Sequence, residues 1–307
     1  MRKLEEDLGI KKEGLGKICS AFAGTSTGSI IASWLCDGKP AGELFDIYRK
    51  ELKNIFKRKK DGPFSKLPGG SDIFYEPFLM GLSLNDLVNS NFCRYDNSGL
   101  KEMLKKYFKG NMDEFKKLIF IPTTFMNGKS VEKVWDPSDR TVSRDFAILS
   151  SCSAPTYFDT VKDRGNEYCD GGMWANDPIM VLESGIRNLC NAVSDNEYKE
   201  MFADGFKILS FNTGMDHQSK APESKSITGW LSYITEEWVA RTGNSNLFEA
   251  RANIGAENVY RCSPKPPKNY KMDDLDVIDD VIEEWDKYYK SVSSYVITFI
   301  ESTLEKK

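Results

Sequence analysis

Hydrophobic and polar positions form blocks along this chain that predict strands and helices in turn. Short apolar runs are typical of buried strands, whereas apolar residues every three or four positions indicate the inner face of a helix. The predicted strands cover residues 18–22, 118–125, 131–135, 206–212 and 258–262. The predicted helices cover residues 29–36, 41–56, 98–108, 144–152, 178–192, 226–253 and 274–305. This alternation favours an α/β fold with a largely parallel sheet.

Two segments depart from the alternation. Residues 57–97 are rich in Gly, Pro, Asn and Ser, yet they also carry many apolar side chains. We interpret them either as a functional loop or as a short helix packed on the core, and the basic run at 57–60 as a solvated loop. A break at 263–268 precedes the helix predicted at 274–305, whose apolar positions form one stripe. We expect that stripe to pack on this domain or on a partner.

Composition narrows the class of protein. The chain has 307 residues and a net charge of −4, which gives no reason to expect nucleic-acid binding. Its seven cysteines contain no C-x-x-C pair, which argues for reduced thiols and against a zinc site or a disulfide framework. No signal peptide and no run of 18 apolar residues is present. We therefore expect one domain over residues 1–307, with a C-terminal helical segment at 264–307, in the cytoplasm.

The segment Gly24-Thr25-Ser26-Thr27-Gly28 carries the strongest chemical signal. It lies between an apolar strand and an apolar helix, so the pattern predicts a sharp strand–turn–helix with the Ser26 hydroxyl exposed. We expect a Cβ at Gly24 or Gly28 to collide where strand and helix cross. The helix N-terminus would favour a negative charge developing beside Ser26. The alternative is a tight structural turn with an unreactive serine.

A serine nucleophile needs a base, and the sequence offers two. His217 is the one histidine of the chain and lies in a polar segment, where an exposed loop histidine is the plain interpretation. Asp170 is followed by Gly171 and Gly172, which allow a tight turn and a close approach of the carboxylate to another group. We favour Asp170 as the base, with a pKa raised by desolvation. Asp177 is better explained as a helix cap before proline.

Taken together, these motifs resemble the patatin-like phospholipase family. Gly-Thr-Ser-Thr-Gly at 24–28 is similar to its nucleophile motif, and Asp-Gly-Gly at 170–172 to its second motif. The segments at 151–158, 176–178 and 209–214 also resemble family landmarks, in the family's order. The resemblance covers roughly residues 15–265. It implies a three-layer α/β/α sandwich, a dyad of Ser26 and Asp170, and hydrolysis of lipid acyl esters without a metal or organic cofactor.

The chain departs from the family at one motif. The family begins with a strand that ends in Asp-Gly-Gly-Gly-x-Arg/Lys-Gly, whose backbone N–H groups form most of the oxyanion hole. The Gly-Gly pairs of this chain are 69–70 and 171–172, both after the nucleophile. We therefore expect the N-terminal strand and glycine loop to be missing, with the N–H of Thr27 as one remaining donor.

These observations predict a lipid acyl hydrolase of the phospholipase A or lysophospholipase type. Its partner would be a lipid or phospholipid, with peripheral contact to membranes, and an oligomer is compatible with the pattern. In such an enzyme residues 57–97 would form a lid or a wall of the acyl pocket. Two alternatives stay open: a Ser26-Asp170-His217 triad esterase, and a non-catalytic patatin-like binding or scaffold protein.

Overall fold

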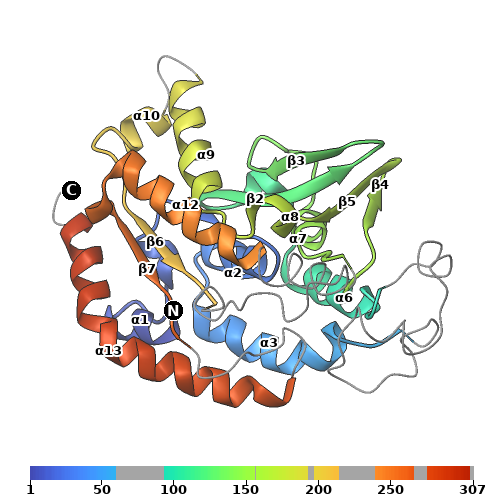
Figure 1. Cartoon of the computed structure of the whole chain (residues 1–307), viewed down its shortest axis with the longest axis horizontal. Coiled ribbons are helices and arrows are strands. Elements are labelled where there is room, and N and C mark those ends of the chain that lie inside the picture. Colours follow the sequence, from blue (N-terminus) through green and yellow to red (C-terminus); the bar gives the residue numbers. More distant parts are fainter. Residues whose placement is uncertain (60–92, 156, 193–196, 214–238, 266–274, 305–307) are drawn as a thin grey trace, which may run out of the picture.

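Strand β2, Leu118–Met126, organises the main sheet of the computed structural model, which describes residues 1–59, 93–155, 157–192, 197–213, 239–265 and 275–304. β1, Ala21–Ala23, pairs with β2 in parallel, and β3, Ser130–Trp135, pairs with it in antiparallel fashion. β5, Asn166–Asp170, also pairs antiparallel with β2 and carries β4, Val161–Asp163, at its far side. The order is β1-β2-β5-β4 (Figure 1).

Helices surround these strands. They are α1 Arg2–Asp7, α2 Thr27–Cys36, α3 Ala41–Ile55, α6 Ser98–Tyr107, α7 Arg144–Ser151, α8 Gly172–Ala175, α9 Ile179–Asn191, α10 Glu197–Met201, α12 Val239–Ile254 and α13 Ile278–Leu304. Short 3₁₀ turns lie at Leu15–Lys17, Met112–Glu114, Ala256–Asn258 and Leu275–Val277.

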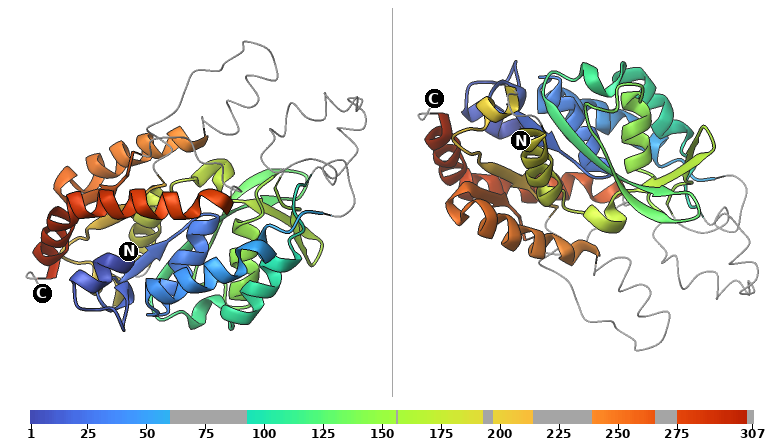
Figure 2. Two further views of the ribbon diagram at one scale, coloured as in Figure 1. Left: turned by 90° about the horizontal axis from the view of Figure 1, so that it is seen from below. Right: turned by 90° about the horizontal axis from the view of Figure 1, so that it is seen from above.

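The alternation of side chains along β2 separates two cores. Ile119 and Ile121 belong to the core that also contains apolar residues of α2, α3, α6 and α7. Leu118 and Phe120 point to the other face, where they pack with residues of α9. Because successive side chains of a strand point to opposite faces, one strand serves two layers of helices. Figure 2 shows α3 and α6 on one side of the molecule and α12 on the other.

A second, two-stranded sheet lies beside the C-terminal helix. β6, Ile208–Phe211, and β7, Val259–Cys262, pair in parallel. The long helix α13 runs next to them and past α1 (Figure 1). Its Val296 and Ile300 are buried in the same core as α2 and α7, and Phe299 contacts the Tyr260 ring at 5.7 Å. The apolar stripe of α13 thus packs partly on this domain, while Tyr295 stays 67% exposed.

The α/β class predicted from the sequence is confirmed, but the sheet is mixed rather than mostly parallel. β1–β2 and β6–β7 are parallel, whereas β3, β4 and β5 join by antiparallel pairs. Tight turns join β2 to β3 and β4 to β5, and strands joined by so short a turn must run antiparallel. The strand predicted at 18–22 begins later, at Ala21, because residues 15–17 form a 3₁₀ turn. Most of the stretch predicted at 57–97, and residues 226–238, lie outside the described residues.

Candidate active site

Ser26 lies on the turn between β1 and α2 in an unusual backbone conformation. Its φ is 54° and its ψ is −129°. Among the described residues, Arg164 is the other non-glycine residue with positive φ. A non-glycine residue in such a region costs on the order of 1–3 kcal/mol and persists only where its surroundings enforce it. The strand–turn–helix predicted from the sequence is therefore present, and the turn is strained at its serine.

Gly24 shows how closely the turn is packed. A Cβ at this residue would lie 2.0 Å from the carbonyl oxygen of Gly28, which no side chain can accept. The N–H of Gly24 also donates to the Phe120 carbonyl at 3.2 Å, which ties the turn to β2. The expected collision at Gly28 is wrong, because a Cβ there would meet nothing within 4 Å. Of the two glycines in this motif, only Gly24 is therefore required by close packing.

Thr27 is the first residue of α2 and is exposed. The next two N–H groups, of Gly28 and Ser29, donate back to the carbonyls of Thr25 and Ser26 at 2.8 Å each. Within the described part of the chain no acceptor is recorded for the N–H of Thr27. Since the first N–H groups of a helix have no acceptor within the helix, this group is free to meet an anion next to Ser26.

Asp170 ends strand β5 and is 4% exposed. Burial raises the pKa of its carboxyl to about 6, while the Ser26 hydroxyl and the Gly172 N–H, both hydrogen-bonding to the charged form, oppose that rise. Oδ1 accepts the Gly172 N–H at 2.6 Å. Oδ2 is buried and has no partner of ordinary hydrogen-bond geometry among the described residues, and the Ser26 hydroxyl is near enough to lower the carboxyl pKa. The carboxylate is thus buried, partly unsatisfied and next to the serine.

The glycines after Asp170 are required by close packing. A Cβ at Gly171 would lie 2.3 Å from the Pro122 carbonyl oxygen, and one at Gly172 would lie 2.9 Å from Oδ1 of Asp170. The other candidate carboxylate, Asp177, is engaged elsewhere. Its Oδ1 accepts the Ile179 N–H at 3.1 Å at the start of α9, and its Oδ2 pairs with Arg261. The structure therefore brings Ser26 together with Asp170 and not with Asp177.

Hydroxyl groups that sequence reasoning missed hold the two sides of the site together. Thr124 Oγ1 donates to the Asp170 carbonyl at 2.9 Å, and the Asp170 N–H donates to the Ser153 carbonyl at 3.0 Å. Thr25 Oγ1 donates to the Ala175 carbonyl at 2.6 Å, across from the nucleophile turn to α8. Because these partners lie far apart in the chain and threonine is common, no local signal marks them.

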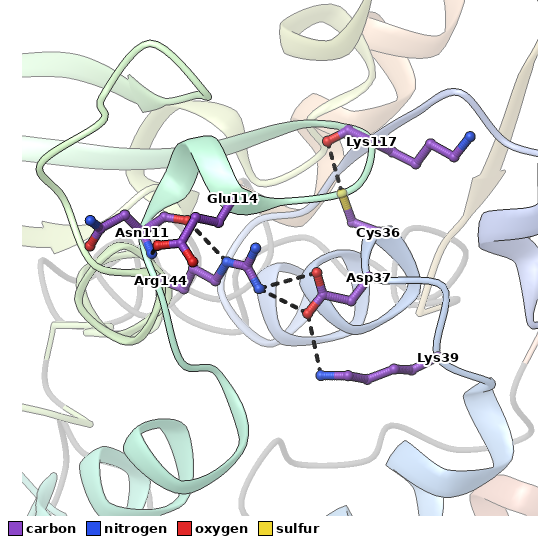
Figure 3. A network of polar contacts seen from close by, with 7 residues as sticks. All are labelled: Cys36, Asp37, Lys39, Asn111, Glu114, Lys117 and Arg144. Atoms are coloured by element: carbon purple, nitrogen blue, oxygen red, sulfur yellow. Dashed lines mark hydrogen bonds and ion pairs between the residues drawn. The ribbon is translucent and has the colours of Figure 1, made fainter.

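Hydrogen bonds join helices α2 and α7 at both of their ends. At the start of α2, the Ser26 N–H donates to Ser151 Oγ at 3.0 Å. At its end, Asp37 accepts both hydrogen bonds from Nη1 of Arg144, at 3.0 and 3.1 Å, and Arg144 Nε donates to the Asn111 carbonyl at 3.0 Å (Figure 3). Asp37 and Arg144 are both buried. The turn at Ser26 is thus held against a second helix.

A small apolar cavity opens beside Ser26. Its volume is about 20 Å³, and apolar side chains from α2, α3, α6 and the segment after α7 line it, among them Ile30, Phe56, Leu100 and Phe158. Tyr48 contributes a hydroxyl, and burial raises the pKa of that hydroxyl to about 12 although a hydrogen bond with the Thr27 side chain lowers it. The cavity therefore offers apolar contact next to the reactive serine.

Other kinds of site find little support in the described residues. Within them, no group of three His, Cys, Asp or Glu side chains is placed to hold a metal ion. The seven cysteines are all free thiols, and Cys152 and Cys169 beside the site are buried. No helix in the described ranges is long and apolar enough to cross a membrane. His217 lies outside the described residues, so its distance from Ser26 is not defined.

Comparison with known proteins identifies the family of this chain. The family model for patatin-like phospholipases matches residues 3–183. The chain is 27% identical over 244 residues to a cGAMP-activated phospholipase of Vibrio cholerae serotype O1, a match that covers 76% of this chain and 62% of that relative. It is 23% identical over 231 residues to a cGAMP-activated phospholipase of Escherichia coli strain TW11681, covering 71% and 57%. The chain thus spans less than two thirds of either relative, and it belongs to the patatin-like phospholipase family.

Proposed function

We propose that this chain is a lipid acyl hydrolase that cleaves carboxylic esters with Ser26 and Asp170. The observation that carries the proposal is the placement of a strained serine hydroxyl beside a buried carboxylate whose pKa is raised to about 6. An ordinary aspartate is a weak base near neutral pH, and a raised pKa makes it a better one. A serine–carboxylate pair of this kind fits acyl transfer.

The reaction follows from this arrangement. Ser26 Oγ attacks the ester carbonyl carbon while Asp170 accepts the hydroxyl proton, and the oxyanion that forms meets the N–H of Thr27 at the start of α2. Collapse of this intermediate expels the alcohol of the lipid, which takes the proton from Asp170 and leaves an acyl group on Ser26. Water then attacks the acyl-enzyme, Asp170 accepts its proton, and the fatty acid departs as Ser26 is restored.

The cavity beside Ser26, about 20 Å³, has room for no more than a water molecule, so the support for an acyl group comes from the apolar character of its lining. Ile30, Leu100 and Phe158 offer no charged side chain, so this side of the site suits the hydrocarbon part of a lipid better than its headgroup. Such an enzyme would act from the cytoplasm with peripheral contact to a membrane.

The two relatives suggest an activator. Both are named as cGAMP-activated phospholipases. We propose cGAMP as the first ligand to test on this chain. A rise in phospholipid hydrolysis on adding cGAMP would support activation, and equal rates with and without it would count against that part of the proposal.

Covalent labelling of the purified chain by a fluorophosphonate probe tests the proposed nucleophile and base. We expect labelling of the wild type, none of Ser26→Ala, strongly reduced labelling of Asp170→Asn, and normal labelling of His217→Ala. Loss of labelling in His217→Ala would instead favour the triad esterase. A folded wild type that is neither labelled nor active on phospholipid vesicles would favour a binding or scaffold protein.

A further inference from the structure

The Ser151 side chain is the one hydrogen-bond acceptor recorded for the Ser26 N–H among the described residues. The distance between Ser26 N and Ser151 Oγ is 3.0 Å, and Ser151 is fully buried. The two residues lie 125 positions apart in the chain. Without this acceptor, the Ser26 N–H would be an unsatisfied donor in a part-buried place, which is unfavourable.

The neighbouring serines behave differently. Ser150 Oγ donates to the Ala147 carbonyl at 2.8 Å, and Ser153 Oγ donates to the Leu149 carbonyl at 2.8 Å, so both bond back along their own segment. Ser150 also accepts the Trp135 indole N–H. Among these buried hydroxyls, Ser151 is the one that meets the nucleophile turn. The neighbouring serines therefore do not share the hydrogen bond that Ser151 makes with this turn.

The position of Ser151 is itself fixed. It ends α7, and the first residue of α7 is Arg144, whose guanidinium binds Asp37 just after α2 (Figure 3). Helices α2 and α7 therefore lie antiparallel with a polar contact at each end. Ser29 adds a contact near the turn, because its hydroxyl lies 3.6 Å from the Cys152 sulfur. A rigid second helix thus presents the Ser151 hydroxyl to the strained residue.

We propose that Ser151 is a positioning residue that holds Ser26 in its strained conformation and so keeps the Ser26 hydroxyl beside Asp170. This inference rests on the proposed role of Ser26 as nucleophile. Positive φ at a non-glycine residue relaxes unless contacts oppose it. The hydrogen bond acts on the backbone of Ser26 and touches neither Asp170 nor the substrate cavity. It also occupies the Ser26 N–H, which leaves the Thr27 N–H as the donor of this turn for an oxyanion.

The test compares Ser151→Ala with Ser150→Ala, a matched control that removes the adjacent buried hydroxyl of α7, whose partners are Trp135 and Ala147. We expect Ser151→Ala to lower kcat for a soluble ester by roughly tenfold, the loss expected when one buried hydrogen bond is removed. KM should change little, and the acidic limb of the pH–rate profile should keep its apparent pKa, because Asp170 is untouched. Ser150→Ala should keep a kcat close to that of the wild type, and Ser151→Thr, which retains the hydroxyl, should recover most of kcat.

Hydrogen exchange gives a readout that does not need activity. The Ser26 amide should be protected in the wild type and in Ser150→Ala, and exchange faster in Ser151→Ala. Equal kcat and equal exchange in the two alanine variants would overturn the proposal. Should Ser151→Ala not fold, rapid exchange of the Ser26 amide in the wild type would overturn it, and slow exchange would support it. An inert wild type with the predicted exchange pattern would reject the proposed hydrolase while leaving the Ser151 contact in place.

Discussion

Replacement of Asp170 by asparagine should strongly lower activity and at the same time stabilise the fold. Burial raises the pKa of this carboxyl from 3.8 to about 6, so the folded chain disfavours the charged form that exists at neutral pH. The asparagine side chain would keep an oxygen for the Gly172 N–H, and its amide nitrogen would stand beside the Ser26 hydroxyl as a donor. The substitution removes a buried charge without removing its neighbours' contacts.

The magnitude follows from linkage between protonation and folding. The shift is about two pKa units, and each unit corresponds to roughly 1.36 kcal/mol, so charged Asp170 costs about 3 kcal/mol well above pH 6. Since the folded-state pKa lies above the unfolded one, this cost grows as pH rises through the window between them. Below about pH 4 both states are protonated and the cost vanishes.

Urea unfolding followed by circular dichroism at several pH values measures this effect. Asp170→Asn should raise the free energy of unfolding at pH 8 by up to about 3 kcal/mol, and the gain should shrink to about 1 kcal/mol or less near pH 4.5. Asp177→Asn is the matched control. It makes the same chemical change at a carboxylate paired with Arg261, so it should destabilise the chain at pH 8 by about 3–5 kcal/mol.

The same substitution should also change the enzymatic rate. As the general base, Asp170 must be unprotonated, so kcat/KM should fall below an apparent pKa near 6. Asp170→Asn should lower kcat/KM by about 10²–10⁴. The reasoning is refuted if Asp170→Asn destabilises the chain as much as Asp177→Asn does, or if its effect on stability is the same at pH 8 and pH 4.5.

Three further outcomes test the packing around the site. Gly24→Ala should prevent folding, because its Cβ would lie 2.0 Å from a carbonyl oxygen. Gly28→Ala should leave the midpoint of thermal unfolding unchanged or higher, because its Cβ would meet nothing within 4 Å. Similar midpoints for the two variants would contradict this packing. Arg144→Gln removes the buried partner of Asp37 but leaves its ion pair with Lys39 at 3.3 Å, so the free energy of unfolding in urea should fall by about 1–3 kcal/mol, and an unchanged value would speak against a tight pair. Burial raises the pKa of the Cys152 thiol, so iodoacetamide at pH 8 should modify it only after denaturation, as mass spectrometry of its peptide would show.

Local periodicity accounts for the elements that the sequence predicted well. The helix predicted at 41–56 is α3, Ala41–Ile55, and the strand predicted at 118–125 is β2, Leu118–Met126. In both elements, the apolar positions that predict the element lie within one continuous stretch of the chain. β4 and β5 were missed because their residues are largely polar and their strand character comes from pairing, of β5 with β2, as at Thr123 opposite Asp170, and of β4 with β5. The turn between them, Arg164-Gly165 with positive φ at both residues, was the one local signal.

The residues of the candidate site likewise fall into those that the sequence predicts and those that it does not. Ser26 and Asp170 could be predicted because each lies in a short motif whose glycines mark a special turn. Ser151, Thr25 and Thr124 could not, since each acts through one hydrogen bond to a residue far away in the chain. Gly28 was overinterpreted for a related reason. A motif names residue types, whereas a steric requirement depends on where the neighbouring backbone lies.

The distribution of favourable and unfavourable contacts argues that the Ser26–Asp170 pair is maintained for chemistry. Ser26 adopts a strained φ, and Asp170 keeps a buried oxygen without a hydrogen-bond partner among the described residues. Two contacts of the surrounding frame oppose relaxation: Arg144 binds Asp37 through two hydrogen bonds, and Ser151 accepts the Ser26 N–H. A strained serine next to an unpartnered carboxylate oxygen is expected where a fold holds reactive groups in place, so this arrangement supports the proposed chemistry. Removing the strained groups should therefore stabilise this chain, and removing the frame should destabilise it.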